Sequence, residues 1–597
     1  MSLELSWALI PQAIDWTITG VKIAAPVWGT NLLLRTVSMR TLQHYGLLHP
    51  RIESAWPRLI PWREFQEYRK AFKEWWEENF SFGSKATGDF LPVLSTLLES
   101  YAPGEIVLGR ARLWWAIPSM QYIGHKPDRS MLVFGMTGSG KTNWTLEQLA
   151  LTPDDASIVN IDVKGVAART VMPPKKRRGL NVQTINVLSG ESASINITRL
   201  IREINERCGQ DMTTIIVEGI AQSLVPENPN EKPFFRIQAW EVWKAAILHE
   251  VSINPDATLM DVYDRLMRGY SEYADDISEA RQLYFLALAE NQNFDGFISR
   301  IGGMLASTDE RTLSNILPSA TGPTAWLGHE NTKRFLGPRH DFNLCDLKGD
   351  KPLILNMACP PGELRTTYAG FFRMMMYLTI KVLELCPNNL HRKAPTRIFW
   401  DEIQNTGPLP PAAATIWPQL RGFQALAIAL PQDIPGLRAV APDAYKTIMA
   451  NSAVQMCFQT ECDETLKYFC EHHLGQKTKR RKNRKTGHVD EKTIPVMQPD
   501  QLRRWLRFTP GRGGNIICAR AGKRPLALRI VEYYRDCPVY LYDQDNEFPM
   551  PAGHRKGRDF WAKHFAPKAI PAPPAPDVVL KAKTYAKARR RQRRRAA

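Results

Sequence analysis

The sequence predicts an α/β protein built on a parallel β-sheet, and three observations support this fold class. A short apolar run, Met131–Phe134, predicts a buried strand that is followed at once by a glycine-rich loop. An apolar-periodic segment after this loop predicts a helix. Short apolar runs then recur with helical patterns between them, at 157–162, 182–187, 352–358, 397–400 and 425–430. Strands that alternate with helices are typical of parallel sheets.

The loop after the first strand matches the pattern G-x-x-x-x-G-K-[ST] in the strand–loop–helix context that a phosphate-binding loop requires. Its glycines let the backbone turn tightly and direct N–H groups at phosphate oxygens, and the helix N-terminus adds a favourable dipole. A chance match is expected about once in fifty chains of this length, and the flanking strand and helix lower those odds. The pattern predicts nucleotide binding by Gly135, Met136, Thr137, Gly138, Ser139, Gly140, Lys141 and Thr142. In such a loop Lys141 neutralises the β- and γ-phosphates, and the Thr142 hydroxyl holds Mg²⁺.

A second nucleotide motif follows the predicted strand at 397–400, where Asp401 and Glu402 come next in the chain. An acid at the end of such a strand meets Mg²⁺ through water, and the next carboxylate can orient and deprotonate the attacking water. The pair is weak evidence alone. Downstream of a phosphate-binding loop in an α/β pattern, it predicts ATP hydrolysis with Mg²⁺ held by Thr142 and Asp401.

Two further polar residues are candidates on weaker grounds. Gln432 follows the strand at 425–430 and could contact the γ-phosphate or its water, but an ordinary capping role fits equally well. Arg421 follows a predicted helical segment at 412–420. An arginine there could reach the nucleotide of a neighbouring subunit, as arginine fingers do, although the residues alone favour simple solvation.

The chain of 597 residues is too long for one core and divides into five predicted segments. We expect a helical N-terminal region at 1–104 and a nucleotide-binding domain in two parts, 105–200 and 346–545. Between these parts the strand patterns disappear, which predicts an all-α insertion at 201–345. Residues 546–597 form a Pro/Ala-rich linker and a basic tail.

The chain has a formal net charge of +18, and about half of this excess lies in the last seventeen residues. This balance favours a polyanionic partner, either nucleic acid or an anionic membrane face, and a disordered solubilising tail is the alternative. Two basic runs lie within the body. PPKKRRG, at 173–179, is expected to be exposed, and KTKRRKNRK, at 477–485, is expected to be a loop or turn.

Cysteine usage and hydropathy indicate a reducing compartment and no convincing membrane span. The nine cysteines are scattered without a disulfide framework. The most apolar N-terminal stretch, 6–34, is interrupted by proline and charged residues, so its uninterrupted runs fall well short of the ~18 residues that span a bilayer. We expect an interfacial or packed helical segment there instead of a transmembrane helix.

The order of these motifs resembles that of the conjugative coupling proteins of type IV secretion systems, the TraG/TraD-like family, over roughly residues 105 to 537. After GMTGSGKT comes NIDVKG, which is similar to the DPKG segment of that family with Val163 in place of proline. The later pieces, which share the family's order and spacing, are SASINITRL, IFWDEIQN, QLRGFQALAIALPQDIPGL, IMANSAVQMCFQTECDETLKYFCEHHLG and KRPLALRIVEYYRD.

The resemblance implies a RecA-like ATPase with an inserted all-α domain that works as a homo-hexamer at the cytoplasmic mouth of the secretion channel. It makes Gln432 a sensor of the nucleotide and Arg421 a finger that acts on a neighbouring subunit. Most members begin with two membrane-spanning helices, which this chain lacks in convincing form. A separate membrane partner, or residues 6–34 at the interface, would then hold the protein at the inner face of the bacterial membrane.

The predicted function is an ATP-driven coupling protein that delivers DNA, with its bound relaxase, to a type IV conjugation channel. One alternative is a coupling ATPase for protein effectors alone. Another is an adaptor platform in which nucleotide only stabilises assembly. DNA stimulation of the ATPase and the effect of Lys141→Ala separate these hypotheses.

Overall fold

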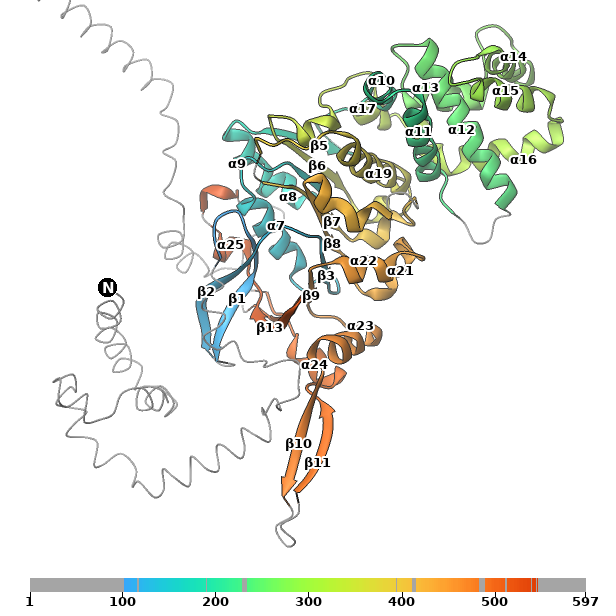
Figure 1. Ribbon diagram of the computed structural model, residues 1–597. Helices are drawn as coiled ribbons and strands as arrows, with labels where there is room; N and C mark the ends of the chain where they lie inside the picture. Colours follow the sequence, from blue (N-terminus) through green and yellow to red (C-terminus); the bar gives the residue numbers. More distant parts are fainter. Residues whose placement is uncertain are drawn as a thin grey trace, which may run out of the picture. The chain divides into compact units, whose positions relative to one another are not determined.

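The computed structural model describes residues 101–545, apart from short gaps at 115–116, 189, 228–232, 393, 411–414, 483–488, 511–512, 538 and 544. Almost all of the predicted N-terminal helical region, including 6–34, and the predicted linker and tail lie outside the described residues. The described residues contain an eleven-stranded sheet with helices around it (Figure 1).

A block of neighbouring parallel strands forms most of the sheet, which confirms the prediction of an α/β fold on a parallel sheet. In sheet order these strands are β5 (Asn181–Asn186), β6 (Leu353–Cys359), β4 (Ile158–Val163), β7 (Thr396–Asp401), β8 (Ala425–Leu430), β3 (Met131–Phe134) and β9 (Val454–Cys457). The carboxyl ends of parallel strands share one edge, so the loops that follow β3, β4, β7 and β8 meet there.

Antiparallel strands extend the sheet beyond β9, so the sheet is mixed and not wholly parallel. They are β12 (Asn515–Arg520), β13 (Lys523–Arg529), β1 (Ile106–Trp114) and β2 (Ile117–His125). Two residues separate β1 from β2, and two separate β12 from β13; a connection this short allows only antiparallel neighbours.

Two hydrophobic cores cover the two faces of the sheet, and β3 contributes to both of them. Leu132 and Phe134 belong to one core, whereas Met131 and Val133 belong to the other. Side chains alternate between faces along a strand, so four consecutive apolar residues are expected where both faces are covered. This double burial explains why the strands appear in the sequence as short continuous apolar runs.

The helices that flank the sheet follow its strands in the chain. Before the insertion they are α7 (Lys141–Leu151), α8 (Val166–Thr170) and α9 (Met172–Arg177). After it they are α18 (Pro361–Arg365), α19 (Ala369–Leu385), η4 (Ile403–Thr406), η5 (Trp417–Phe423), α21 (Ile434–Val440), α22 (Tyr445–Asn451), α23 (Asp463–Tyr468), η6 (Phe469–Leu474), α24 (Pro499–Trp505), α25 (Tyr533–Asp536) and η7 (Val539–Leu541).

A group of helices without strands separates β5 from β6, and it contains the segment that lacks strand patterns in the sequence (Figure 1). Capping residues start several of these helices. Thr258 and Asp261, for example, form a reciprocal capping box on α13. The helices are α10 (Ile197–Cys208), α11 (Gln210–Leu224), α12 (Pro233–Ile253), α13 (Leu259–Arg268), α14 (Ile277–Glu290), α15 (Phe297–Ser307), α16 (Glu310–Thr321), η2 (Gly322–Gly328), α17 (Thr332–Leu336) and η3 (Leu344–Lys348).

The prediction of exposure for PPKKRRG was wrong for part of the segment. Most of it forms α9, which the prolines favour because proline is well tolerated in the first helical turn. The Lys175 side chain is fully buried, and its Nζ donates a hydrogen bond to the Thr152 carbonyl oxygen at 3.2 Å. Burial lowers the pKa of Lys175 to about 7.

The prediction of a loop or turn for KTKRRKNRK was also wrong for most of the run. Residues Gln476–Lys482 form β10, which pairs with β11 (Val489–Pro495) in a separate antiparallel hairpin (Figure 1). The register places Arg480 opposite Glu491 and Arg481 opposite Asp490. The partner strand follows the basic run in the chain, so reading the basic run by itself misses this backbone pairing.

No helix among the described residues is both long enough and apolar enough to cross a membrane.

Candidate nucleotide site

The glycine-rich loop runs from the end of β3 to the start of α7, as the sequence predicts. Gly138 and Gly140 adopt left-handed backbone conformations, with φ of 80° and 92°, that only glycine adopts without strain. The loop is held from outside by two hydrogen bonds. Gly135 N–H donates to the Gln432 carbonyl at 3.1 Å, and Met136 N–H donates to the Gln459 carbonyl at 2.8 Å.

Lys141 is the first residue of α7, and its side chain lies back over the loop. The residue is 6 % exposed, and its Nζ donates a hydrogen bond to the Gly135 carbonyl oxygen. Burial lowers the pKa of Lys141, and Asp401, Glu402 and Asp433 oppose that shift because their charges attract the ammonium. An anionic group in the loop would also stabilise the charged ammonium.

Two features of the loop fit a phosphate chain. The Ser139 hydroxyl oxygen is buried and has no hydrogen-bond partner among the described residues. A Cβ on Gly138 would meet nothing within 4 Å, so this part of the loop is open. A buried hydroxyl without a partner is costly, and a ligand with several acceptor oxygens would relieve that cost.

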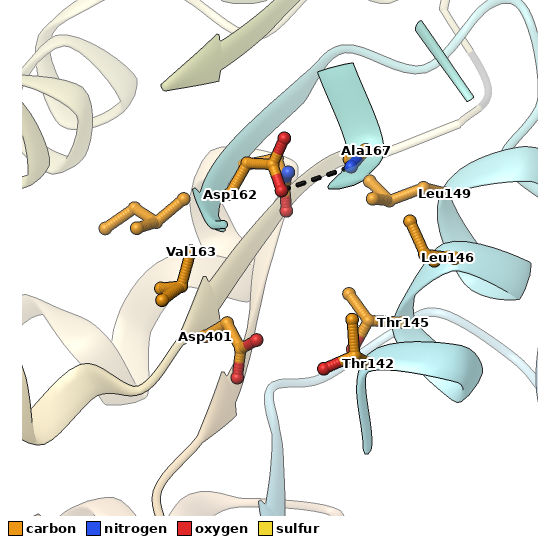
Figure 2. Close-up of a pocket in the computed structure, with 10 residues that line it drawn as sticks. Thr142, Thr145, Leu146, Leu149, Asp162, Val163, Ala167 and Asp401 are labelled. Atoms are coloured by element: carbon orange, nitrogen blue, oxygen red, sulfur yellow. Dashed lines mark hydrogen bonds between the residues drawn. The ribbon is translucent and has the colours of Figure 1, made fainter. Parts of the chain in front are cut away.

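The metal-binding residues of the prediction line one pocket. Thr142 and Asp401 both contribute to its wall, and Figure 2 shows the Thr142 hydroxyl and the Asp401 carboxyl directed toward each other. A hydroxyl and a carboxylate are oxygen ligands of the kind that Mg²⁺ prefers. The donor set therefore fits Mg²⁺.

Burial raises the pKa of the Asp401 carboxyl to about 6, and the nearby Lys141 ammonium counteracts that effect while Glu402 adds to it. One oxygen of this carboxyl, Oδ1, accepts a hydrogen bond from the Glu402 backbone N–H at 2.9 Å. A desolvated carboxylate without a full counter-charge gains most from a divalent cation. A divalent cation bound at this carboxylate would supply the missing counter-charge.

Glu402 has an unusual backbone conformation for its residue type. Its φ of 47° lies in the left-handed region, where a residue with a side chain is strained by about 1–2 kcal/mol. Asn405 stabilises the arrangement, because its Nδ2 donates to Glu402 Oε2 at 2.6 Å and its backbone N–H donates to the Glu402 carbonyl at 2.8 Å. Strain of this kind is typical of functional sites.

The structure brings Gln432 to the glycine-rich loop. Its Nε2 donates to the Thr137 hydroxyl at 3.4 Å, and its backbone N–H donates to Gln404 Oε1, also at 3.4 Å. Gln432 therefore bridges the loop after β3 and the loop after β7. This is the place that a sensor of the nucleotide would occupy.

Arg421 does not join the site of its own chain. It is exposed on η5, which precedes β8, whereas Gln432 follows the other end of that strand. A strand of six residues is roughly 20 Å long, so Arg421 lies near the opposite edge of the sheet.

Four further residues line or support the site, and the sequence motifs assign a role to none of them. Asp162 ends the buried run at 157–162, a visible signal, and lines the same pocket as Asp401 (Figure 2). Its carboxylate accepts hydrogen bonds from the N–H groups of Ala167 and Ala168, at 3.1 and 2.8 Å.

Of the other three residues, Asn405 and Gln459 lie within the segments IFWDEIQN and IMANSAVQMCFQTECDETLKYFCEHHLG, which carry the family resemblance but assign them no role, and Phe508 lies in no motif. Asn405 and Gln459 make the contacts described above. The Phe508 ring lies over Gly140, where an added Cβ would meet it at 3.0 Å. Only tertiary folding brings Gln459 and Phe508 to a loop more than 300 residues earlier.

The fold and the site together define a class, the RecA-like proteins with a phosphate-binding loop. The chain belongs to the type IV secretory system conjugative DNA transfer family, because the model of that family matches residues 106–571. Its role is that of a coupling protein in conjugation. The predicted family is thereby confirmed.

Solved structures agree with this assignment at the level of the fold. The unbound bacterial conjugative coupling protein TrwBdeltaN70 is similar with a TM-score of 0.55 and 14% identity, over 76% of this chain and 94% of that chain. The plasmid coupling protein TrwB in complex with ADP and Mg²⁺ gives a TM-score of 0.53 and 13% identity, over 76% and 95%. Its complex with the non-hydrolysable GTP analogue GDPNP gives 0.54 and 13%, over the same shares. A comparison with curated proteins finds no match.

Proposed function

We propose that this coupling protein hydrolyses ATP, with Mg²⁺, to drive DNA and its bound relaxase toward a type IV secretion channel. One observation carries the proposal. The loops that follow β3, β7 and β8 meet at one sheet edge, and they present Lys141, the Asp401–Glu402 pair and Gln432 to the same place. These are the residue types that phosphoryl transfer from a nucleotide to water requires.

The ligands follow from the loop and from the similar structures. Lys141, Ser139 and the loop N–H groups would hold the phosphates, and Thr142 and Asp401 would hold Mg²⁺. TrwB in complex with ADP and Mg²⁺, whose fold this chain shares, supports that choice. When bound, the metal ion neutralises charge that develops on the phosphate oxygens.

Glu402 is the proposed general base. Its carboxylate accepts a proton from water as the water oxygen bonds to the γ-phosphorus and the bond to the β–γ bridging oxygen breaks. Asn405 orients the carboxylate through Oε2, which leaves Oε1 for the water. Gln432 would sense whether the γ-phosphate is present, because it forms hydrogen bonds with both the phosphate loop and the loop that carries Glu402.

The proposed active assembly is a homo-hexameric ring in which Arg421 acts in trans. Its place near the far edge of its own sheet supports this assignment, because an exposed arginine there faces away from its own nucleotide. An arginine that is supplied by a neighbouring subunit stabilises charge in the transition state and raises the hydrolysis rate by about 10³–10⁵-fold.

The proposed partners follow from charge and family. A net charge of +18 favours a DNA backbone, which is contacted without sequence preference and with strong salt dependence. The family supplies the secretion channel as the second partner. The relaxase, a membrane partner and a place on the cytoplasmic face of the inner membrane complete the proposal.

The function is tested by ATP hydrolysis and ring assembly with and without single-stranded DNA, at low and moderate salt. The variants are Glu402→Gln, which removes the base but keeps the shape, and Lys141→Ala. We expect wild-type hydrolysis to rise with DNA. We expect Glu402→Gln to bind ATP and lose about 10²-fold or more in kcat, the range for general-base catalysis.

Two results would contradict the proposal in different ways. A rate of ATP hydrolysis that DNA does not change at any salt concentration would favour a coupling ATPase for protein effectors. A Lys141→Ala variant that assembles and still supports transfer would favour a platform that nucleotide merely stabilises.

A further inference from the structure

A buried arginine lies between the helical insertion and the loop that carries Glu402. Arg373 belongs to α19, and it is 4 % exposed. Its Nε donates to the Ser223 carbonyl at 2.9 Å, and its Nη1 donates to the Thr406 carbonyl at 2.8 Å. Ser223 lies in the last turn of α11, within the insertion. Thr406 is the last residue of η4, the short helix that begins directly after the Asp401–Glu402 pair.

Main-chain carbonyls, and not a carboxylate, hold this guanidinium. Within the described part of the chain Arg373 makes no ion pair, and burial lowers its pKa to about 10. The last carbonyls of a helix have no partner within the helix and carry partial negative charge, so the end of α11 is a favourable place for a cation. The position of the guanidinium therefore depends directly on the position of the α11 backbone.

The same guanidinium restricts the Glu402 loop on its other side. A Cβ on Gly407, which has φ of 74°, would lie 3.0 Å from Arg373 Nη1, so the loop backbone passes close over the arginine. One residue before Thr406, Asn405 holds the Glu402 carboxylate. A continuous series of hydrogen bonds and backbone connections thus links α11, through Arg373 and the η4 backbone, to Glu402, the proposed base.

We propose that Arg373 is a positioning residue that holds the Glu402 loop in its working geometry and makes that geometry depend on the helical insertion. A mechanical force on the insertion that moves α11 relative to α19 then changes the rate of ATP hydrolysis without changing the affinity for nucleotide. This inference rests on the proposed function, since it assigns Glu402 as the base. A misplacement of about 1 Å at a catalytic group can cost 10²-fold in rate, so a small shift is enough.

The test compares Arg373→Met with Arg397→Met. Arg397 is a matched control, because it too is buried, burial lowers its pKa to about 10, and it also donates to a main-chain carbonyl, that of Gly104. It lies near the start of β7, at the opposite end of that strand from Asp401. The two substitutions remove the same group at similar structural cost, but only one of them touches the Glu402 loop.

We expect Arg373→Met to lower kcat at least about tenfold and to abolish DNA stimulation, with KM for ATP within about twofold of wild type. Arg373→Lys keeps a cation that can donate to at least one carbonyl, and should recover part of kcat. Arg397→Met should keep kcat per folded molecule within about twofold, at a comparable loss in Tm. Equal kcat losses in the two methionine variants, or a loss in Arg373→Met that appears only in KM, would overturn the proposal.

Amide hydrogen exchange without nucleotide provides a second readout that does not need activity. We expect Arg373→Met to raise exchange at 402–407 by about tenfold or more, while Arg397→Met leaves this segment unchanged. If Arg373→Met does not fold, Gly407→Ala and Arg373→Lys address the same contact. Unchanged exchange in both would reject the inference. An inactive wild type with the expected exchange pattern would instead count against the proposed function alone.

Discussion

Single residues set the charge balance of the site, and Asp401 is the clearest example. Burial raises the pKa of its carboxyl from 3.8 to about 6. The group is therefore neutral below about pH 6 and negative above it, and only the negative form binds Mg²⁺ well. We expect kcat/KM of the Mg²⁺-dependent ATPase to fall as the pH drops through about 6, because this ratio reports on the free enzyme.

Competition between protons and metal ions makes that prediction specific. Raising the Mg²⁺ concentration should move the midpoint to lower pH, since the cation and the proton compete for the same carboxylate. A pH series from 5 to 8 at two Mg²⁺ concentrations measures this shift. A midpoint that stays constant across Mg²⁺ concentrations would mean that another group controls the profile.

At the scale of elements, the insertion and the sheet share one hydrophobic core. A single cluster of buried side chains contains Leu132 of β3, Met375 of α19 and Trp243 of α12. Trp243 is fully buried, and its Nε1 donates to the Ala320 carbonyl at 2.9 Å. Because this core is continuous, we expect a substitution that destabilises the insertion to disturb the nucleotide site as well.

We expect Trp243→Ala to lower the free energy of unfolding by about 3–5 kcal/mol, the usual cost of emptying a large aromatic site. Ile237→Ala on the same helix is the control. Ile237 is 46% exposed, so its loss should change stability by less than about 0.5 kcal/mol. Urea unfolding followed both by tryptophan fluorescence and by binding of a nucleotide analogue measures the two effects. If nucleotide binding survives a first fluorescence transition that Trp243→Ala moves to lower urea concentration, the insertion unfolds independently.

At the scale of the whole molecule, the proposed ring makes a prediction about mixtures of variants. Lys141→Ala lacks a working phosphate loop but keeps Arg421, and Arg421→Ala has the opposite defect. Each variant alone should be inactive. If Arg421 acts on the neighbouring subunit, mixed rings contain junctions where an intact loop faces an intact arginine, so mixing should restore part of the ATPase.

The mixing experiment is read as ATPase activity against the ratio of the two variants at constant total protein. We expect a maximum at intermediate ratios. Arg421→Ala should still bind nucleotide with near wild-type affinity, because Arg421 lies far from the loop in its own chain. A flat profile from two variants that assemble normally would mean that Arg421 has no role across the subunit boundary.

Much of the fold could be predicted because its signals are local. The strands at 158–163, 353–359, 396–401 and 425–430 are buried on both faces, so each appears as an apolar run of about the right length. The convergence of Lys141, Asp401 and Gln432 follows from the same rule, since the ends of parallel strands share one edge. Their catalytic roles stay predictions until the variants are measured.

Other features could not be predicted because they depend on distant partners. Lys175 looked like part of an exposed basic run, yet it is buried against the Thr152 carbonyl. The basic run at 477–485 looked like a loop, yet most of it pairs with a strand that follows. Lysine and arginine patterns indicate charge, but burial and pairing are set by the rest of the chain.

The sequence alone determined that this protein has a glycine-rich phosphate loop between a strand and a helix, an acid pair at a strand end, and the motif order of a coupling protein. These properties are encoded in contiguous residues, where backbone freedom, hydrophobic period and side-chain chemistry are local. Only the tertiary structure decided what surrounds them. Phe508 meets Gly140, and Arg373 meets both α11 and the Glu402 loop, only when segments that are distant in the chain pack together. No local pattern specifies which carbonyl a buried guanidinium will meet.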